Sequence, residues 1–282
     1  MPSVRRPLRF ATANHRLSTA LVLVLVVSCS VFEASAPPRP GEHLTIGIKF
    51  DQPGVGHRTD EGTYEGIDVG IALRVAAGMG VPEHAVTFVE ARSEERENLL
   101  AQQKVDLVVA SYSITEPRKR YVDFAGPYFT AGQALLVRRK NTDVTGPQSL
   151  DSPDWRLCSV IGSAAAHRVK NRWARSVTLK EVESYRECVD ALRNGDVDAV
   201  TTDDVVLAGY VAAEPEKFKL VGPPFSQERY GIGLHRGDPR RAAVTRALRV
   251  AVEDGSWRRI MRENLSKSNF PIPPVPQILD SP

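Results

Sequence analysis

No apolar stretch of this chain reaches the roughly twenty residues that a helix needs to cross a membrane. Residues 17–27 are apolar or small, and they follow arginines at positions 5, 6, 9 and 16. A basic start before a short apolar run is typical of an export signal. We therefore expect residues 1–28 to be a signal peptide rather than a permanent anchor.

The chain also lacks a large excess of either basic or acidic residues. The chain has 37 Lys and Arg against 34 Asp and Glu, and the four arginines of the signal exceed the net charge of +3. This balance gives no support for a nucleic-acid partner. The six histidines show no paired metal-ligand spacing, and no G-x-S-x-G nucleophile motif occurs. We expect no metal and no other cofactor.

Cysteine is scarce, with three residues in the whole chain. Cys29 ends the sequence Val-Val-Ser-Cys, which resembles a bacterial lipobox, so we predict its acylation; the alternative is an ordinary cleavage site with a chance cysteine. Residues 29–43 contain three prolines and small polar residues, and should form an extended tether. Such a protein would be lipid-anchored on the extracellular face of the cytoplasmic membrane.

The remaining cysteines, Cys158 and Cys188, are an even number in an exported chain. Thiols of exported proteins tend to pair, so we predict a disulfide between these two residues. The alternative is a pair of buried free thiols, which small cysteines often are.

Strands alternate with helices from about Leu44 onward, which indicates an α/β fold. Residues 44–49, 86–89, 105–110 and 157–161 read as strands, and Asp68 is suited to cap a helix that ends at Gly80. Two segments, 100–106 and 192–198, are similar: each predicts a helix end, a turn and a strand start. Five residues after its last aspartate, each copy reaches a polar residue, Ser111 or Asp203.

The repeat suggests two similar halves whose strand ends face one cleft, because ligands bind at the carboxyl ends of strands in open α/β sheets. Ser111, Ser113 and Arg118 could then hold a carboxylate, and Asp203 an ammonium, which together describe an α-amino acid. The alternatives are a solvated surface charge for Arg118, and for Asp203 a helix-cap role that Asp204 could equally fill.

Several motifs in order resemble the type 3 extracellular solute-binding proteins of ABC amino-acid importers, most closely actinobacterial glutamate-binding lipoproteins. The resemblance covers residues 44 to about 265 and rests on IGIKFDQPG (46–54), VDLVVASYSITEPRK (105–119), VDFAGPYF (122–129), VIGS (160–163), VDAVTTDD (197–204) and YGIGL (230–234).

The resemblance implies a two-lobed periplasmic-binding-protein type II fold, with two α/β lobes joined by a two-segment hinge. Lobe 1 would comprise 44–137 and 229–269, lobe 2 would comprise 138–228, and 270–282 would be a proline-rich tail. The resemblance further implies that Arg118, Ser113 and Ser163 hold the ligand carboxylate, and that Asp203 and Ser111 hold its ammonium. Implied partners are an amino acid, an ABC permease and its ATPase, with the protein itself a monomer.

Two positions depart from the family pattern, and one suggests specificity. Ile67 replaces an aromatic residue that usually covers the ligand, and Ala164 replaces a threonine that often donates to the carboxylate. Lys49 stands where relatives that bind cationic or amide ligands tend to have an acidic residue, which favours glutamate or aspartate. A surface lysine is the alternative. Arg96 and Arg92 are weaker candidates for the same role, because they lie in a charge cluster.

Two other functions stay open at this stage. A sensor would present the amino acid to a separate membrane signalling protein. An enzyme on the same fold would use a cleft carboxylate, for which Glu65, Glu116 and Glu228 lie near predicted cleft loops. Since a site that holds both ends of an amino acid needs no catalyst, we expect a binding protein that is not an enzyme and has no catalytic residues.

Overall fold

The structure is a computed structural model that describes residues 43–280 and 282. The predicted signal peptide, the lipidation of Cys29 and nearly all of the tether lie outside these residues. None of the helices in the described part has both the length and the apolar character that a membrane crossing requires.

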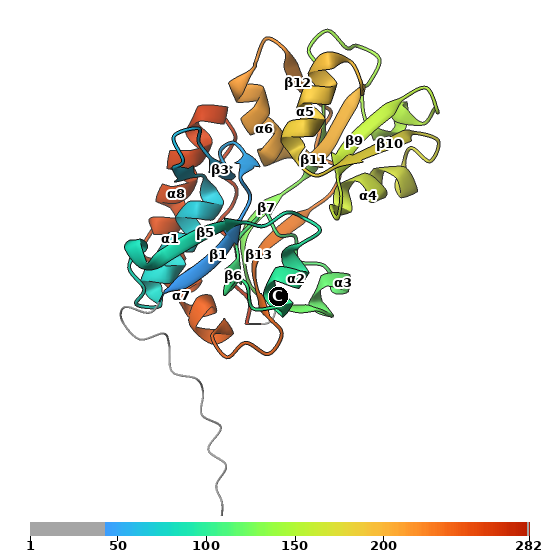
Figure 1. Cartoon of the computed structure of the whole chain (residues 1–282). Helices are drawn as coiled ribbons and strands as arrows, with labels where there is room; N and C mark the ends of the chain where they lie inside the picture. The colour runs from blue at the N-terminus through green and yellow to red at the C-terminus, as the bar shows by residue number, and fades with distance from the viewer. Residues whose placement is uncertain (1–42, 281) are drawn as a thin grey trace, which may run out of the picture. The chain divides into compact units, whose positions relative to one another are not determined.

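The first lobe is built on a five-stranded sheet in the order β5-β1-β6-β13-β7. Helices α1, α7 and α8 cover one face of this sheet, and α2 and α3 lie on the other (Figure 1). The elements are β1 (Leu44–Ile48), β5 (Val86–Glu90), β6 (Leu107–Val108), β7 (Val122–Ala131), β13 (Glu228–His235), α1 (Ile67–Gly78), α2 (Arg96–Ala101), α3 (Glu116–Lys119), α7 (Arg241–Glu253) and α8 (Ser256–Leu265).

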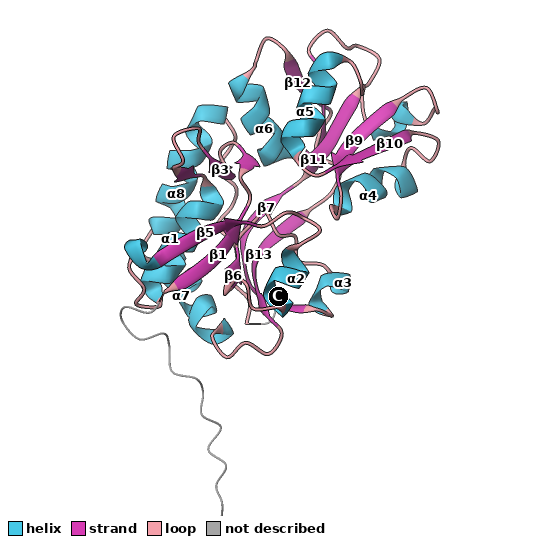
Figure 2. Ribbon diagram, in the orientation of Figure 1, coloured by secondary structure: helices cyan, strands magenta, loops and turns pink. Residues whose placement is uncertain are grey.

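The second lobe has its own sheet, in the order β10-β9-β11-β8-β12. Helix α4 packs on one face with Val169, and α5 and α6 pack on the other (Figure 2). The elements are β8 (Gln133–Arg138), β9 (Arg156–Val160), β10 (Thr178–Val182), β11 (Ala199–Asp203), β12 (Phe218–Val221), α4 (Ala164–Arg172), α5 (Tyr185–Asn194) and α6 (Asp204–Ala213).

The two sheets share one plan, as the internal repeat predicted. β6 and β11 are the middle strands, each parallel to one neighbour and antiparallel to the other. The two repeated aspartates form equivalent hydrogen bonds: Asp106 accepts the backbone N–H of Thr45 at 2.8 Å, and Asp198 accepts that of Arg156 at 3.0 Å. Each carboxylate thus ties the start of the middle strand to the strand beside it.

The chain crosses between the lobes twice. Gly132 separates β7 in the first sheet from β8 in the second, and residues 222–227 lead back from β12 to β13. The predicted boundary at residue 137 was therefore too late, and 133–137 belong to lobe 2. Buried apolar residues continue through both strands, so the residue pattern does not mark the crossing.

The predicted disulfide is confirmed. Cys158 in β9 and Cys188 in α5 are bonded, with their Cα atoms 5.6 Å apart. The bond holds α5 against the second sheet.

The start of α1 differs from the prediction. The helix begins at Ile67, and its N-cap residue is Gly66, with φ of 118°. A Cβ on Gly66 would lie 2.2 Å from the carbonyl oxygen of Val55, so only glycine fits. Asp68 is fully buried inside the first turn and serves the neighbouring strand end instead of the cap.

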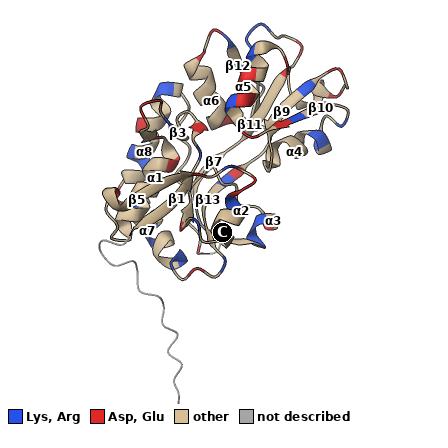
Figure 3. Ribbon diagram, in the orientation of Figure 1, with Lys and Arg blue, Asp and Glu red and all other residues tan. Residues whose placement is uncertain are grey.

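Two smaller features complete the first lobe. A three-stranded sheet of β2 (Asp51–Gln52), β3 (Gly56–Arg58) and β4 (Tyr64–Glu65) follows β1. The proline-rich tail returns to the lobe, where Leu279 donates its N–H to the carbonyl of Gly126 at 2.8 Å and so covers the edge strand β7. Figure 3 shows basic and acidic residues interspersed along both lobes.

Candidate functional site

A polar turn follows the middle strand β6 of the first sheet. Ser111 has φ of 43°, a left-handed conformation that is uncommon for residues other than glycine. The carboxylate of Asp68 accepts the N–H of Ser111 at 2.7 Å and the hydroxyl of Tyr128 at 2.7 Å, and so fixes this turn. Burial raises the pKa of Asp68 to about 7, because the charged form loses its hydration.

Arg118 reaches the same region from the short helix α3, whose N-cap residue is Thr115. Its guanidinium donates to the carbonyl of Ser113 at 2.9 Å and, across the lobes, to that of Gly162 at 3.2 Å. Glu97 lies 3.5 Å from its Nε atom. Burial, followed by the nearby charge of Arg96, lowers the pKa of Arg118 to about 10, so it remains a cation at neutral pH.

Arg96, at the start of α2, is 3 % exposed. It donates to the carbonyls of Ala110 at 3.0 Å and Ser93 at 3.3 Å, and its guanidinium lies 4.4 Å from the ring centroid of Tyr112. Carbonyls and an aromatic face orient this cation, and no carboxylate of the described residues lies within ion-pair distance of it, although its charge lowers the pKa of Asp68. Arg96 can therefore offer a positive charge to a ligand.

The second lobe contributes the N-terminus of α4. Ser163 is its N-cap residue and accepts the N–H of Ala165 at 3.2 Å. The hydroxyls of Ser163 and Tyr185 lie 3.0 Å apart, and the N–H of Tyr185 donates to Asp51 of the first lobe at 2.6 Å. The lobes therefore meet beside this serine.

Asp203 ends the middle strand β11 of the second sheet. It is 9 % exposed and makes no side-chain cap bond, although it stands at the N-cap position of α6. Asp204 accepts the N–H groups of Gly132 and Val205 instead. The carboxylate of Asp203 accepts the hydroxyl of Tyr230 at 2.5 Å. Burial, followed by the charge of Glu228, raises the pKa of Asp203 to about 7.

Arg168 and Glu228 lie next to Asp203. Nη1 of Arg168, in α4, pairs with Oε1 of Glu228, in β13, and also donates to Gln133 at 3.0 Å and Ser226 at 3.2 Å. The sequence interpretation missed Arg168, because a cation in the basic run HRVKNR looks like part of a solvated helix face. Glu228 was considered only as a possible acid or base.

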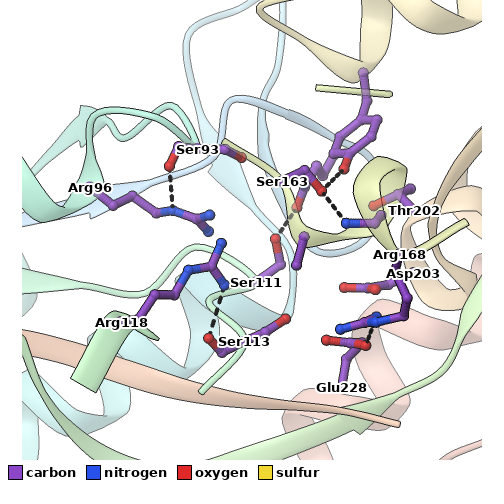
Figure 4. Close-up of a pocket in the computed structure, with 14 residues that line it drawn as sticks. Ser93, Arg96, Ser111, Ser113, Arg118, Ser163, Arg168, Thr202, Asp203 and Glu228 are labelled. Atoms are coloured by element: carbon purple, nitrogen blue, oxygen red, sulfur yellow. Dashed lines mark hydrogen bonds and ion pairs between the residues drawn. The ribbon is translucent and has the colours of Figure 1, made fainter. Parts of the chain in front are cut away.

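One pocket between the lobes brings many of these side chains together (Figure 4). Arg96 and Arg118 lie together on one side, and Arg168, Asp203 and Glu228 are grouped on the other. The lining consists of Gln52, Ser93, Arg96, Ser111, Ser113, Arg118, Ser163, Ala164, Ala165, Arg168, Tyr185, Thr202, Asp203 and Glu228.

The pocket thus brings together six of the seven predicted ligand-binding residues: Ser111, Ser113, Arg118, Arg96, Ser163 and Asp203. Lys49 is not part of this lining. It is 2 % exposed, its ammonium lies 3.8 Å from Asp51, and burial lowers its pKa. Glu65 and Glu116 also lie outside the lining.

A zwitterion fits this arrangement of charges. A carboxylate could pair with Arg118 and the hydroxyls around it, while an ammonium pairs with Asp203 on the opposite side. The residues that the structure describes contain no group of three side chains suited to hold a metal ion. The site therefore offers hydrogen bonds and fixed charges to a small polar ligand.

Comparisons with known proteins place this geometry in a wider context. The family model for bacterial extracellular solute-binding proteins, family 3, matches residues 44–267. A glutamate-binding protein of Corynebacterium efficiens is 38% identical over an alignment of 237 residues, with 80% of this chain and 80% of that protein covered. An ABC transporter glutamine-binding protein of Bacillus subtilis is 32% identical, over 80% of this chain and 82% of its own.

A solved structure supports the fold. An ancestral arginine-binding protein bound to glutamine aligns with a TM-score of 0.74 at 30% identity. The alignment covers 80% of this chain and 98% of that one. Both lobes therefore follow an arrangement that has been solved in a protein with glutamine bound.

Proposed function

The chain belongs to the bacterial extracellular solute-binding proteins of family 3, and from that premise we propose that it binds glutamate for an ABC importer. It is a solute-binding receptor of the extracytoplasmic kind. The identity of the ligand and the roles of the individual residues are the proposal. The glutamate-binding relative and the charges of the pocket support it.

The charges of the residues that line the pocket are the main support for glutamate as the ligand. Three arginines and two acidic residues line it. Arg168 is paired with Glu228, and the α-carboxylate and α-ammonium of a ligand would pair with Arg118 and Asp203. Arg96 then remains as a buried cation without a carboxylate partner among the lining residues, so a second ligand carboxylate complements the site.

We assign the side-chain end of the ligand to Arg96, supported by Ser93. Both residues line the pocket, whereas Lys49 lies outside the lining and pairs with Asp51. Lys49 would have a secondary role, because its ion pair with Asp51 offsets its charge. Ser111 and Ser113 would contribute hydroxyl and backbone groups near the α-carbon.

The cellular setting follows from the same proposal. The receptor would deliver its ligand to an ABC permease and its ATPase as a monomer. Acylation of Cys29 would hold it at the outer face of the cytoplasmic membrane. Fractionation of cells that express Cys29→Ala tests the anchor: release into the medium supports acylation, and unchanged membrane retention contradicts it.

Calorimetry on the exported domain tests the ligand. L-glutamate, L-aspartate, L-glutamine and L-arginine are titrated in turn at pH 7.5. We expect micromolar or tighter binding of glutamate, which corresponds to about 8 kcal/mol or more, weaker binding of glutamine and none of arginine. Equal or stronger binding of arginine would contradict the charge argument, and no heat with any amino acid would contradict the function.

A further inference from the structure

The ammonium end of the pocket contains two carboxylates, although an α-amino acid offers it one cation. Asp203 is 9 % exposed and Glu228 is 4 % exposed, so both are shielded from water. Two carboxylates that share a buried site oppose each other's ionisation. Something must compensate the second charge if Asp203 is to bind an ammonium.

Arg168 is placed to supply this compensation. Its Nη1 atom pairs with Oε1 of Glu228, and Glu228 also accepts the hydroxyl of Ser226 at 2.8 Å. Asp203 has a different environment: its hydrogen-bond partner is the neutral hydroxyl of Tyr230, and no cation of the described chain lies within ion-pair distance of it. The guanidinium of Arg168 therefore pairs with Glu228, and the carboxylate of Asp203 stays available for the ligand ammonium.

The network around Arg168 also involves both segments that cross between the lobes. Gln133, at the start of β8, accepts from Arg168 at 3.0 Å and donates to Thr201 of β11 at 2.9 Å. Ser226 precedes β13 and accepts the N–H of Gln133 at 3.2 Å. All of the bonds from Arg168 are made by its Nη1 atom, so three acceptors from different elements hold this end of the guanidinium toward Glu228.

We propose that Arg168 is a positioning residue that acts on the amino-acid site through Glu228: it neutralises the second carboxylate, so that Asp203 alone serves the ligand ammonium. This inference rests on the proposed function, because it concerns the ammonium of the same ligand. It assigns Arg168 no contact with the ligand.

The electrostatic surroundings of Asp203 agree with this role. Burial raises the pKa of Asp203 most, the charges of Glu228 and Asp204 raise it further, and the hydrogen bond from Tyr230 and the charge of Arg168 lower it. The other groups that face it are Tyr230 of β13, Tyr185 of α5 and Arg118 of α3. Without Arg168, mainly the hydrogen bond from Tyr230 would oppose the effect of Glu228, and Asp203 would hold its proton to a higher pH.

A double-mutant cycle on the full exported domain tests the proposal. Arg168→Met should weaken L-glutamate binding at pH 6 by about tenfold, since a rise of one unit from a pKa of about 7 lowers the ionised fraction of Asp203 about tenfold at that pH. It should also move the pH midpoint of binding upward. In a Glu228→Gln background, the same Arg168→Met change should cost less than about threefold, because no second carboxylate remains to be neutralised.

Arg172→Met is the matched control, an exposed arginine in the same helix, and should leave the affinity unchanged. An equal loss from Arg168→Met in both backgrounds would overturn the proposal, since Arg168 would then act on the ligand directly. No loss in either background would overturn it as well. If Arg168→Met does not fold, the comparison of Glu228→Gln with the double variant decides: similar affinities support the proposal, and a tenfold difference refutes it.

A measurement without ligand separates this inference from the proposed function. Carbon-13 NMR of the aspartate carboxyls follows the titration of Asp203 in the free protein. Its midpoint should rise in Arg168→Met and return in the double variant. An unchanged midpoint refutes the role of Arg168, whereas failure of the wild type to bind any amino acid refutes the proposed function and leaves the NMR result valid.

Discussion

The two ends of the pocket balance their charges in different ways. At the cationic end, Arg96 is held by carbonyl oxygens and an aromatic ring, which orient the charge without cancelling it. At the acidic end, Glu228 is cancelled by Arg168 within the protein, and Asp203 is left to accept a cation. Each end of the pocket thus leaves one charged side chain without an oppositely charged partner in the described part of the chain. The ligand must supply that partner, and the pocket thereby selects the charges of its ligand.

The largest expected effect comes from removing the charges that every α-amino acid would share. Arg118→Met and Asp203→Asn should each weaken glutamate and glutamine alike by roughly thirty-fold to a few thousand-fold, since losing one partner of a desolvated pair costs about 2 to 5 kcal/mol. Calorimetry with both ligands measures this loss. Binding within threefold of wild type in either variant would break the assignment of the two ends.

The pH dependence tests the acidic end by itself. Only ionised Asp203 pairs with an ammonium, and its pKa is raised to about 7 in the free protein. Affinity should therefore be highest above pH 7 and fall by up to about tenfold for each pH unit below it. Titrations at pH 5, 6, 7 and 8 at constant ionic strength give the slope. A flat profile would show that Asp203 does not carry the ammonium.

Lys49→Met sharpens the comparison at the cationic end. Lys49 lies outside the lining and pairs with Asp51, so its removal should weaken glutamate by only a few-fold, with a smaller effect on glutamine. Affinities for both ligands, measured side by side, check this. A loss of glutamate binding larger than that of Arg96→Met would transfer the side-chain role to Lys49, as the sequence first suggested.

The disulfide should matter least for affinity. Its loop of 30 residues predicts a stability contribution of about 3 to 4 kcal/mol. Cys158→Ala with Cys188→Ala should lower the denaturation midpoint but leave the glutamate affinity nearly unchanged at 15 °C, because neither cysteine lines the pocket. Urea unfolding and calorimetry measure the two effects. A tenfold loss of affinity in the folded variant would contradict this separation.

The sequence predicted the parts of the site that follow a local pattern. Ser111 and Asp203 could be placed together because each lies at the end of a middle strand in a repeated α/β unit. Arg118 follows Ser111 closely in the sequence, so it could be expected at the same end of the first sheet. The two sheets and the disulfide were predicted in the same way, from alternation and from cysteine number in an exported chain.

The residues that sequence reasoning missed depend on contacts between distant segments. Arg168 gains its role from Glu228, sixty residues further along the chain, which only the crossing strand β13 brings near. Asp68 was expected to cap a helix, but close packing of Gly66 against Val55 starts that helix earlier and leaves the carboxylate to Ser111. Lys49 was assigned to the ligand side chain from its position in the family pattern, but it is buried beside Asp51 and is not part of the lining.

The most direct test of the central claim compares glutamate and glutamine binding in Arg96→Met. These ligands have nearly the same shape and differ in one side-chain charge, so the change isolates the cation that the pocket leaves open. We predict that Arg96→Met weakens glutamate by about thirty-fold or more and glutamine by less than about threefold. Equal losses for both ligands, or an unchanged preference for glutamate, would contradict the claim that this end of the pocket selects an anionic amino acid.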